Sequence, residues 1–373
     1  MTTLPDWAPQ YDLDRPLHNK AMRSVCYAPF TTLDFGPFGD VIVCCANHAQ
    51  RVGNVREQSL REIWHSKAME ELRDALTQYD FSKGCDRCAW YVAQGDFKTS
   101  FSKKDDVYDI GPEWIKGPLK MDFRLSNICN FACIMCHGDC SSRIRKEVQK
   151  LPPIESPYAE PFFSQLKEFL PRLQYSWFTG GEPFLVEDNY RIWDMMIECA
   201  PQIRLRITTN GSILTPRVQE ILENLTLVDL CVSIDGATKQ TFEKVRRGAH
   251  FEKVVEHLDY FSEYCRRTGA NLRFSTCGLL QNWHELPDIF LLAARYGASV
   301  WMNTVLPGGN HHAGPVSIHD APPRLKKRIS EFLAWSYPQI QGSIDDHSDG
   351  NYQMLMNTLG APLEPDEAGA LIL

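Results

Sequence analysis

The sequence predicts an α/β fold in which a parallel sheet covered by helices follows a small α+β segment. Between Pro118 and about Gly309, six strand-like runs alternate with stretches of helical periodicity, which is the pattern of consecutive βα units. Before them, residues 1–112 carry five cysteines in short strands together with one clear helix. No apolar run approaches the roughly 20 residues that a membrane span requires. We therefore expect three parts: residues 1–112, residues 118–309 and a C-terminal extension, 310–373.

The composition of the 373 residues is that of a soluble globular protein, with 43% hydrophobic and 23% charged residues. Lys and Arg total 39 against 47 Asp and Glu, a net charge of -8. A nonspecific nucleic-acid binder normally has a basic surplus, so this class is disfavoured. The N-terminus has neither the basic nor the apolar region of a secretory signal. We expect a cytoplasmic protein that binds neither nucleic acid nor membrane.

In the N-terminal part, a helix is predicted to begin at Ser59, because Ser59-x-x-Glu62 forms a capping box. Apolar residues then recur at helical spacing and form one buried face: Leu60, Ile63, Trp64, Ala68, Leu72, Ala75 and Leu76. The polar stretch from Ser100 to Gly117 is interpreted as a linker.

The second part contains the predicted sheet. Its strands are expected at Leu119–Leu125, Tyr175–Phe178, Arg204–Thr208, Leu227–Ile234, Asn271–Thr276 and Ala298–Asn303. One helix is expected to start at Thr215, with Pro216 in its first turn, and another to place Phe251, Val254, Val255, Leu258 and Phe261 on one stripe. Such a sheet is either open and doubly wound or curled into a partial barrel, and both forms keep functional loops at the carboxyl ends of the strands. The tail should hold a helix at Pro323–Trp335 followed by irregular sequence.

Thirteen cysteines are too many for a chain without an export signal to use as disulfides, so metal or cluster ligation is the hypothesis to examine. Directly after the first strand of the predicted sheet, Cys129, Cys133 and Cys136 form a C-x3-C-x2-C run. Three thiolates can hold three irons of a [4Fe–4S] cube and leave the fourth iron open. The alternative is a zinc site completed by His137 or Cys140, which is disfavoured because structural zinc sites prefer paired C-x2-C knuckles.

With the segments that follow it, this run resembles the radical S-adenosylmethionine (SAM) superfamily. The family's GGEP motif, its TNG segment, its S-x-D-G segment and its basic stretch have counterparts in the expected order: Gly180-Gly181-Glu182-Pro183, Thr209-Asn210-Gly211, Ser233-Ile234-Asp235-Gly236 and Arg246-Arg247-Gly248. The resemblance spans about residues 118–305. It implies a partial (β/α)6 TIM-like barrel as the core.

The resemblance also implies SAM as cofactor and a role for each segment. Gly180 and Gly181 let the backbone approach the ligand, and Glu182 is a charge-assisted partner for the SAM ammonium group. Thr209 and Asn210 contact the ribose, and Ser233 and Asp235 lie near the methionyl group. Arg246 or Arg247 reaches the SAM carboxylate. An external one-electron reductant of flavodoxin or ferredoxin type reduces the cluster, which cleaves SAM to methionine and a 5′-deoxyadenosyl radical.

The N-terminal cysteines resemble the twitch/SPASM auxiliary-cluster module. Cys26-x12-Gly39-x4-Cys44 is followed, after the capped helix, by Cys85-x2-Cys88. This resemblance implies a second [4Fe–4S] cluster, held by four cysteines and suited to electron transfer. In most relatives the module follows the barrel, whereas here it precedes it. A four-cysteine zinc ribbon is the alternative, and Cys45 is an alternative ligand to Cys44.

Several residues remain as candidates without a motif. Cys231 and Cys277 lie on or at the end of predicted strands and are either hydrogen-atom donors to a substrate radical or packed thiols. Trp301 and Asn303 are candidates to flank adenine. Side chains that are either substrate contacts or solvated surface are His137, Arg143, Arg145, His311 and His312.

The function that the resemblance implies is that of a radical SAM oxidoreductase whose auxiliary cluster takes up the substrate's electron. Dehydrogenation, oxidative decarboxylation and cross-linking in secondary metabolism are its expected outcomes. Alternatives are a redox-neutral epimerase with a cysteine hydrogen donor and a maturase of ribosomal peptides, so the substrate is a small molecule or a peptide. A non-catalytic iron–sulfur or zinc protein would not need a motif at each strand end, and is disfavoured.

Overall fold

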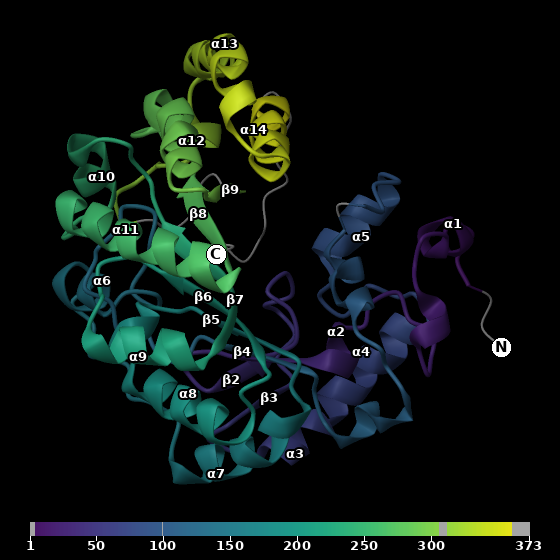
Figure 1. Cartoon of the computed structure of the whole chain (residues 1–373). Helices are drawn as coiled ribbons and strands as arrows, with labels where there is room; N and C mark the ends of the chain where they lie inside the picture. The colour runs from purple at the N-terminus through teal and green to yellow at the C-terminus, as the bar shows by residue number, and fades with distance from the viewer. Residues whose placement is uncertain (1–3, 99, 306–311, 360–373) are drawn as a thin grey trace. The chain divides into compact units, whose positions relative to one another are not determined.

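The computed structural model describes residues 4–98, 100–305 and 312–359 (Figure 1). The chain divides into two compact units. Unit 1 consists of residues 1–125, 155–177 and 191–203. Unit 2 consists of residues 126–154, 178–190 and 204–373.

Unit 1 is built on a small mixed sheet. Its strands are β1 (Thr32–Phe35), β2 (Asp40–Ile42), β3 (Gly53–Asn54), β4 (Lys120–Phe123) and most of β5 (Tyr175–Phe178). Its helices are α1 (Ala8–Asp12), α2 (Ala28–Thr31), α3 (Leu60–Trp64), α4 (Lys67–Thr77), α5 (Asp86–Ala93), α7 (Glu160–Phe169) and part of α8 (Glu187–Cys199). β1 pairs antiparallel with β2 and parallel with β4, and β2 pairs antiparallel with β3. On the apolar face the Phe35 ring stacks on Phe123 at 5.6 Å and meets Phe162 of α7 at 5.4 Å.

The capping box at Ser59 is present, but the predicted single helix is two helices, α3 and α4. The Ser66 hydroxyl accepts a hydrogen bond from the N–H of Met69 and donates one to the carbonyl of Val52 at 2.6 Å. A serine that caps a new helix in this way competes with continuation of the old one. The break shifts the helical phase, so that Met69 is buried in place of the predicted Ala68.

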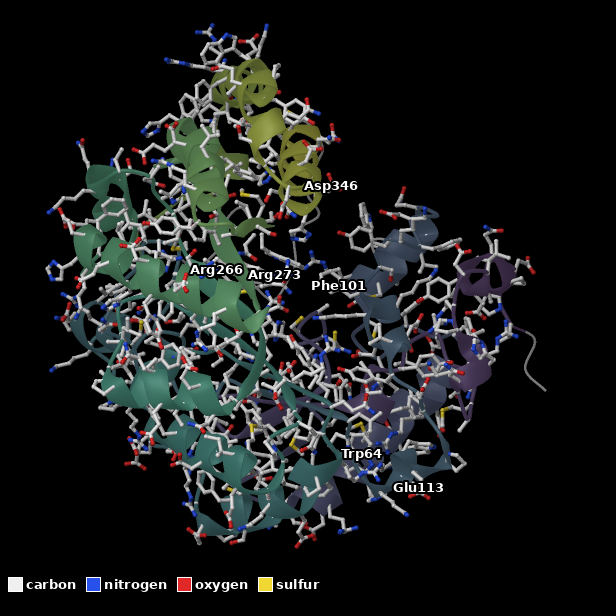
Figure 2. All side chains as sticks on the ribbon, viewed as in Figure 1. Trp64, Phe101, Glu113, Arg266, Arg273 and Asp346 are labelled. Carbon is white, nitrogen blue, oxygen red and sulfur yellow. The ribbon has the colours of Figure 1, made fainter. Side chains whose placement is uncertain are left out.

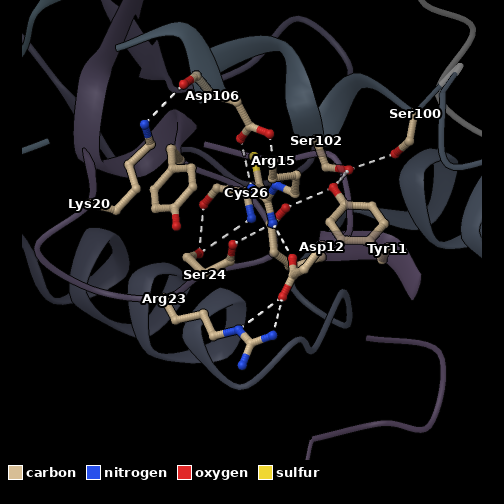
Figure 3. Close-up of polar contacts among 12 residues, drawn as sticks. Tyr11, Asp12, Arg15, Lys20, Arg23, Ser24, Cys26, Ser100, Ser102 and Asp106 are labelled. Carbon is tan, nitrogen blue, oxygen red and sulfur yellow. Dashed lines mark hydrogen bonds and ion pairs between the residues drawn. The ribbon is translucent and has the colours of Figure 1, made fainter. Parts of the chain in front are cut away.

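The prediction of a linker at Ser100–Gly117 is wrong. A 3₁₀ helix covers Phe101–Val107, and Ser102 and Asp106 within it are buried. The buried guanidinium of Arg15 binds both carboxylate oxygens of Asp106 at 2.7 Å and one of Asp12 at 2.8 Å (Figure 3). Charged residues suggested an exposed segment, whereas Asp106 is buried against the distant Arg15.

Replacing Arg15 by Met should strongly destabilise the protein. Two buried carboxylates would lose a partner whose side chain is only 1% exposed, which typically costs about 3–5 kcal/mol. Arg61→Met is the matched control, because Arg61 and Glu168 pair at 3.6 Å with both side chains more than 60% exposed. We expect a change below about 1 kcal/mol there. Urea unfolding measures both; equal effects would refute the assignment of Arg15 as a structural anchor.

Unit 2 contains the remaining strands and helices. The strands are β6 (Arg204–Thr209), β7 (Thr226–Ser233), β8 (Asn271–Cys277) and β9 (Ser299–Asn303). The helices are α6 (Ser142–Glu147), α9 (Pro216–Asn224), α10 (Lys239–Val245), α11 (Phe251–Thr268), α12 (Leu286–Arg295), α13 (Pro323–Ile340) and α14 (Asp346–Thr358). β6 to β9 pair in parallel in sequence order. All six predicted strands of residues 118–309 are present, with ends shifted by at most two residues.

The two faces of the β6–β9 sheet differ. One face is apolar and buried, and consists of Leu205, Ile207, Leu230, Val232, Leu272, Phe274, Val300 and Met302. Helices α11 and α12 pack against β8 and β9. The other face carries partly exposed polar side chains, among them Arg206, Asp229 and Arg273, which is labelled in Figure 2. A doubly wound sheet is covered by helices on both faces, so a one-sided helical cover favours the wall of a barrel.

The prediction of irregular sequence after the tail helix is wrong, because α14 forms there. Asp345 caps it by accepting the N–H of Ser348 at 2.7 Å. The helix then covers the edge strand β9. The Ser348 hydroxyl accepts the N–H of Val300 at 2.8 Å, and the Asn351 side chain accepts that of Met302 at 3.1 Å.

Candidate functional site

The three cysteines of the C-x3-C-x2-C run come together in one loop of unit 2. The Cys129 thiol interacts electrostatically with Cys133, and Cys136 interacts with both. Burial raises the pKa of the Cys129 thiol to about 12. Thiolates at this site therefore need compensating positive charge, which bound iron supplies.

Hydrogen-bond donors around these sulfurs fit thiolate ligands of a cluster. The N–H of Phe131 donates to Cys129 Sγ at 3.4 Å, and Asn210 Nδ2 lies 3.9 Å from the same sulfur. Arg246 Nη1 lies 3.9 Å from Cys133 Sγ. Donors and a buried cation next to sulfur favour its negative form, as the donor set of an iron–sulfur site requires.

The predicted GGEP loop packs directly on the cysteine loop. The N–H of Gly181 donates to the carbonyl of Ser126 at 2.9 Å, and that of Glu182 to Ile128 at 2.7 Å. A Cβ added to Gly181 would lie 2.1 Å from the carbonyl oxygen of Ile128. The absence of a side chain at Gly181 thus allows two protein loops to approach, a reason the sequence did not suggest. Gly180 has φ +115°, a conformation that favours glycine.

Glu182 is fully buried and joins the ends of two strands. Its Oε1 accepts the Thr209 hydroxyl at 2.8 Å and the N–H of Phe184 at 3.2 Å, and its Oε2 accepts the N–H of Asn210 at 2.7 Å. A carboxylate has about four acceptor positions, so roughly one remains for a ligand. Burial raises the pKa of Glu182 to about 7, against the opposing effect of these bonds and of Arg246.

The TNG segment is also tied to the cysteine loop. Asn210 Nδ2 donates to Asn130 Oδ1 at 2.9 Å, and Asn130 Nδ2 donates to the Ser212 hydroxyl at 2.9 Å. Asn130 and Ser212 were not predicted as site residues. Asn130 lies within the cysteine run, but the sequence does not indicate a role for its side-chain amide. That role follows only from its hydrogen bonds to the loop after β6.

Of the two candidate arginines, Arg246 is buried and Arg247 is exposed. Arg246 Nη2 pairs with Asp235 Oδ2 at 2.6 Å. Asp235 Oδ1 also accepts the N–H of Cys277 at 2.7 Å, which joins the ends of β7 and β8. Burial raises the pKa of Asp235, and Arg246 opposes this effect. The guanidinium therefore links the S-x-D-G segment to Cys133.

Glu285 is a site residue that the sequence did not indicate. It accepts the N–H groups of Ala237 at 2.8 Å and Thr238 at 3.1 Å, and the hydroxyls of Thr238 and Thr241 at 2.7 and 2.5 Å. These bonds fix the start of α10, whose end carries Arg246. Glu285 lies about 50 residues further along the chain, so no local spacing connects it with the motif.

The two candidate hydrogen donors, Cys231 and Cys277, are both buried. Cys231 is 0% exposed, and its sulfur accepts a hydrogen bond from Arg206 Nη2 at 3.2 Å. Cys277 interacts electrostatically with Asp235, Arg246 and Cys133. Cys277 therefore lies beside the cysteine loop, and neither thiol is presented on an exposed surface.

Three of the other candidates, His137, Arg143 and His312, lie at the cysteine loop. His137 Nε2 lies 3.4 Å from Cys140 Sγ. Arg143 pairs with Glu147 and Arg145 with Asp139. His312 Nδ1 lies 3.1 Å from the carbonyl oxygen of Cys136, and His311 is outside the described residues. On β9, Trp301 is 41% exposed, and Asn303 Nδ2 donates to the Ser275 hydroxyl at 2.8 Å.

In unit 1 the four N-terminal cysteines also come together. The Cys26 thiol interacts electrostatically with Cys85 and Cys88, and Cys44 with Cys26. The left-handed conformation of Gly39, with φ +85°, explains the glycine of the motif. The N–H of Ala46 donates to Cys44 Sγ at 3.3 Å.

Cys45 has a different environment from Cys44. The pKa of Cys45 is lowered to about 6. The largest cause is its hydrogen bond with Cys44, and the positive charges of Lys104 and Lys120 lower it further. Cys44 interacts electrostatically with Cys26 of the four-cysteine set, which favours Cys44 as the ligand.

Both sets consist of sulfur donors, which suit iron–sulfur clusters. Within residues 4–98, 100–305 and 312–359, no three His, Cys, Asp or Glu side chains are arranged to hold a single metal ion. The conclusion that the two cysteine sets can hold iron–sulfur clusters therefore rests on their sulfur donors and on the hydrogen bonds that the sulfurs receive.

A comparison with protein families matches residues 123–293 to the radical SAM superfamily. Residues 123–293 thus form a radical SAM domain. Residues 26–89 match the SPASM iron-sulfur cluster-binding domain. These matches confirm the predicted partial-barrel fold class and the N-terminal auxiliary domain. The radical SAM match implies SAM and an iron–sulfur cluster as cofactors, and the SPASM match implies a further cluster. The roles of individual residues stay predictions.

The curated relatives described next are 26–27% identical to this chain over about half of its length. The mycofactocin maturase MftC of Mycolicibacterium smegmatis is 26% identical over 200 residues, which cover 52% of this chain and 46% of MftC. The AdoMet-dependent heme synthase of Methanosarcina barkeri is 27% identical over 188 residues, 48% of each chain. The chain thus spans about half the length of the curated relatives it matches.

Among solved structures, SuiB of Streptococcus suis bound to S-adenosylmethionine aligns over 82% of this chain and 69% of SuiB. The TM-score is 0.44 and the identity is 15%. In the described part of this radical SAM protein, no helix has the length and apolar character needed to cross a membrane.

Proposed function

We propose that this radical SAM enzyme oxidises its substrate, and that the four-cysteine site of unit 1 takes up the electron. When bound, the cluster of the C-x3-C-x2-C loop supplies the electron that cleaves SAM to a 5′-deoxyadenosyl radical, which abstracts a hydrogen atom. The substrate then loses one electron and one proton. An external flavodoxin- or ferredoxin-type protein is the proposed reductant.

The observation that carries the proposal is the sulfur set of Cys26, Cys44, Cys85 and Cys88. Four thiolates saturate a cube, so no iron is left to bind a substrate, and electron transfer is the remaining role. The epimerase alternative is weaker because Cys231 and Cys277 are both buried, and Cys231 accepts a bond from Arg206.

The residues of unit 2 orient SAM and exclude water. Arg246 is the arginine that we assign to the SAM carboxylate, because it is buried beside Cys133 whereas Arg247 is exposed. The remaining acceptor position of Glu182 is assigned to the SAM ammonium group. Asn210 and Asp235 hold the surrounding loops in place through the bonds described above.

We place the substrate on the polar face of β6–β9. Arg273 Nε pairs with Asp229 Oδ1 at 2.8 Å, and the Arg206 guanidinium lies 5.4 Å from the centre of the Trp301 ring. Polar side chains that are only partly exposed can exchange water for substrate groups. MftC is called a maturase, which supports a precursor peptide as the substrate class.

The decisive experiment replaces all four auxiliary cysteines by Ala. The full chain, reconstituted anaerobically, should hold about eight irons, two cubes; the variant should hold about half. With dithionite and SAM the variant should still form 5′-deoxyadenosine but no oxidised product. With a precursor peptide encoded beside the gene, the unmodified enzyme should give a product lighter by two hydrogen atoms.

Two results would contradict the proposal. Stoichiometric zinc in the four-cysteine site after anaerobic purification would remove the electron acceptor. A product of unchanged mass that carries solvent deuterium at one carbon would indicate the epimerase alternative instead.

A further inference from the structure

Thr209 and Asn210 of the TNG segment are turned into the protein, although the family resemblance assigns both to the SAM ribose. Thr209 is 1% exposed and Asn210 is 7% exposed. The Thr209 hydroxyl donates to Glu182 Oε1 at 2.8 Å, and its oxygen accepts the N–H of Gly211 at 3.1 Å. A hydroxyl has one hydrogen, so the only side-chain donor of Thr209 is already used by Glu182.

The side-chain amide of Asn210 is directed entirely at protein atoms. Its Oδ1 accepts the N–H of Ser212 at 2.9 Å and the hydroxyl of Ser212 at 2.6 Å. Its Nδ2 donates to Asn130 Oδ1 at 2.9 Å and lies 3.9 Å from Cys129 Sγ. An asparagine amide offers two hydrogens and two acceptor positions. All four face groups of this chain, and none is left for a ribose hydroxyl.

Three side chains form a closed ring that fixes the direction of this amide. Asn130 Nδ2 donates to the Ser212 hydroxyl at 2.9 Å, Ser212 donates to Asn210 Oδ1, and Asn210 Nδ2 donates to Asn130 Oδ1. Turning either amide over would place two donors or two acceptors against each other. The ring therefore keeps the second N–H of Asn210 on the side of Cys129.

Asn210 also holds the carboxylate that we assign to the SAM ammonium group. Its backbone N–H donates to Glu182 Oε2 at 2.7 Å, while the Thr209 hydroxyl holds Oε1. Two adjacent residues thus connect Glu182 with the cysteine loop. A ligand bound by both the carboxylate and the cluster requires a fixed separation between them, and a misplacement of about 1 Å can be costly.

We propose that Thr209 and Asn210 are positioning residues that fix Glu182 relative to the cysteine loop, and that neither side chain contacts the SAM ribose. Ser212 and Asn130 act through Asn210. This inference rests on the proposed function, because it requires Glu182 to bind the SAM ammonium group. Loss of a bond in this network weakens SAM binding at its amino end, so the loss does not depend on the ribose hydroxyls.

The experiment measures the binding of SAM and of its 2′-deoxy and 3′-deoxy analogues by equilibrium dialysis. The full chain is reconstituted anaerobically, and no reductant is added, so that SAM stays intact. Thr209→Val and Asn210→Ala remove the two side chains, Ser212→Ala opens the ring, and Ser212→Thr keeps the hydroxyl. Asn224→Ala is the matched control, because that exposed amide donates only to the carbonyl of Glu220 at 2.8 Å.

Thr209→Val, Asn210→Ala and Ser212→Ala should each weaken SAM binding by about two- to tenfold, the scale of a lost hydrogen bond. Ser212→Thr should restore the affinity, and Asn224→Ala should leave it unchanged. The weakening should be the same for SAM and for both analogues. A side chain that contacts a ribose hydroxyl would instead matter less for the analogue that lacks this hydroxyl.

A smaller effect of Thr209→Val or Asn210→Ala on either analogue than on SAM would therefore overturn this inference alone. Failure of Ser212→Thr to restore binding would also overturn it, since loss of packing would then explain Ser212→Ala. Glu182→Gln tests the underlying assignment. Unchanged SAM binding by this variant would overturn the proposed role of Glu182 itself.

Discussion

Replacing Cys129, Cys133 and Cys136 together by Ala should abolish the formation of 5′-deoxyadenosine. The same change should lower the iron content from about eight to about four per chain, since one of two cubes is lost. The three thiols interact with one another in one loop, and no other part of the chain is proposed to hold SAM. Iron analysis and chromatography of the reaction with dithionite and SAM measure both effects.

Cys140→Ala is the control that separates a cluster from a zinc site. Cys140 contacts His137 at 3.4 Å and lies next to Cys136, so a zinc site completed by it would lose its metal. A three-cysteine cluster should keep its iron and its SAM cleavage in this variant. SAM cleavage by the triple variant would show that the catalytic cluster is bound elsewhere.

Gly181→Ala should reduce SAM cleavage by at least about a hundredfold, the scale of loss that a misplacement of about 1 Å can cause. The new Cβ would lie 2.1 Å from the carbonyl oxygen and 2.6 Å from the carbonyl carbon of Ile128. Backbone atoms cannot rotate away as a side chain can, so the two loops must separate. Iron content should stay close to that of the unmodified enzyme, because the cysteines are untouched. Binding of SAM and its cleavage are the measurements.

Gly350→Ala provides the comparison for this change. Gly350 lies within α14, and apart from its chain neighbours and the backbone of its own helix no atom lies within 4 Å of its added Cβ. Alanine in a helix is typically more stable than glycine by about 0.5–1 kcal/mol. This variant should therefore unfold at a higher urea concentration and cleave SAM at the normal rate. Equal rates for Gly181→Ala and Gly350→Ala would mean that the contact with Ile128 does not position SAM.

Local sequence signals predicted much of the fold. The six strands of residues 118–309 were visible because buried strands are short apolar runs between turn residues. The helix that begins after Thr215 could be predicted from its N-cap residue. Elements that depend on distant partners were missed: the segment of Phe101–Val107 is held by Arg15, and α14 is held by its bonds to β9. Such partners lie tens of residues away, where no periodicity connects them.

The same division applies to the site. Cysteine spacing predicted both sulfur sets, because ligands of one cluster must be close in space and some are then close in sequence. Residues that hold the ligand-bearing loops in place through hydrogen bonds, such as Asn130, Glu285 and Asn47, do not occur at a characteristic sequence spacing. The role of Gly181 was predicted as an approach to the ligand, whereas its close neighbour in the structure is the backbone of Ile128.

The side chains of α14 have a consequence for self-association. A terminal strand with free N–H groups can recruit a strand from another molecule and so begin an aggregate. Ser348 and Asn351 occupy the donors of Val300 and Met302, so α14 blocks this route without adding a strand. A chain shortened before Asp345 would lose that protection. We expect such a chain to form multimers through β9, with a loss of monomer in light scattering even where its sulfur sites are intact.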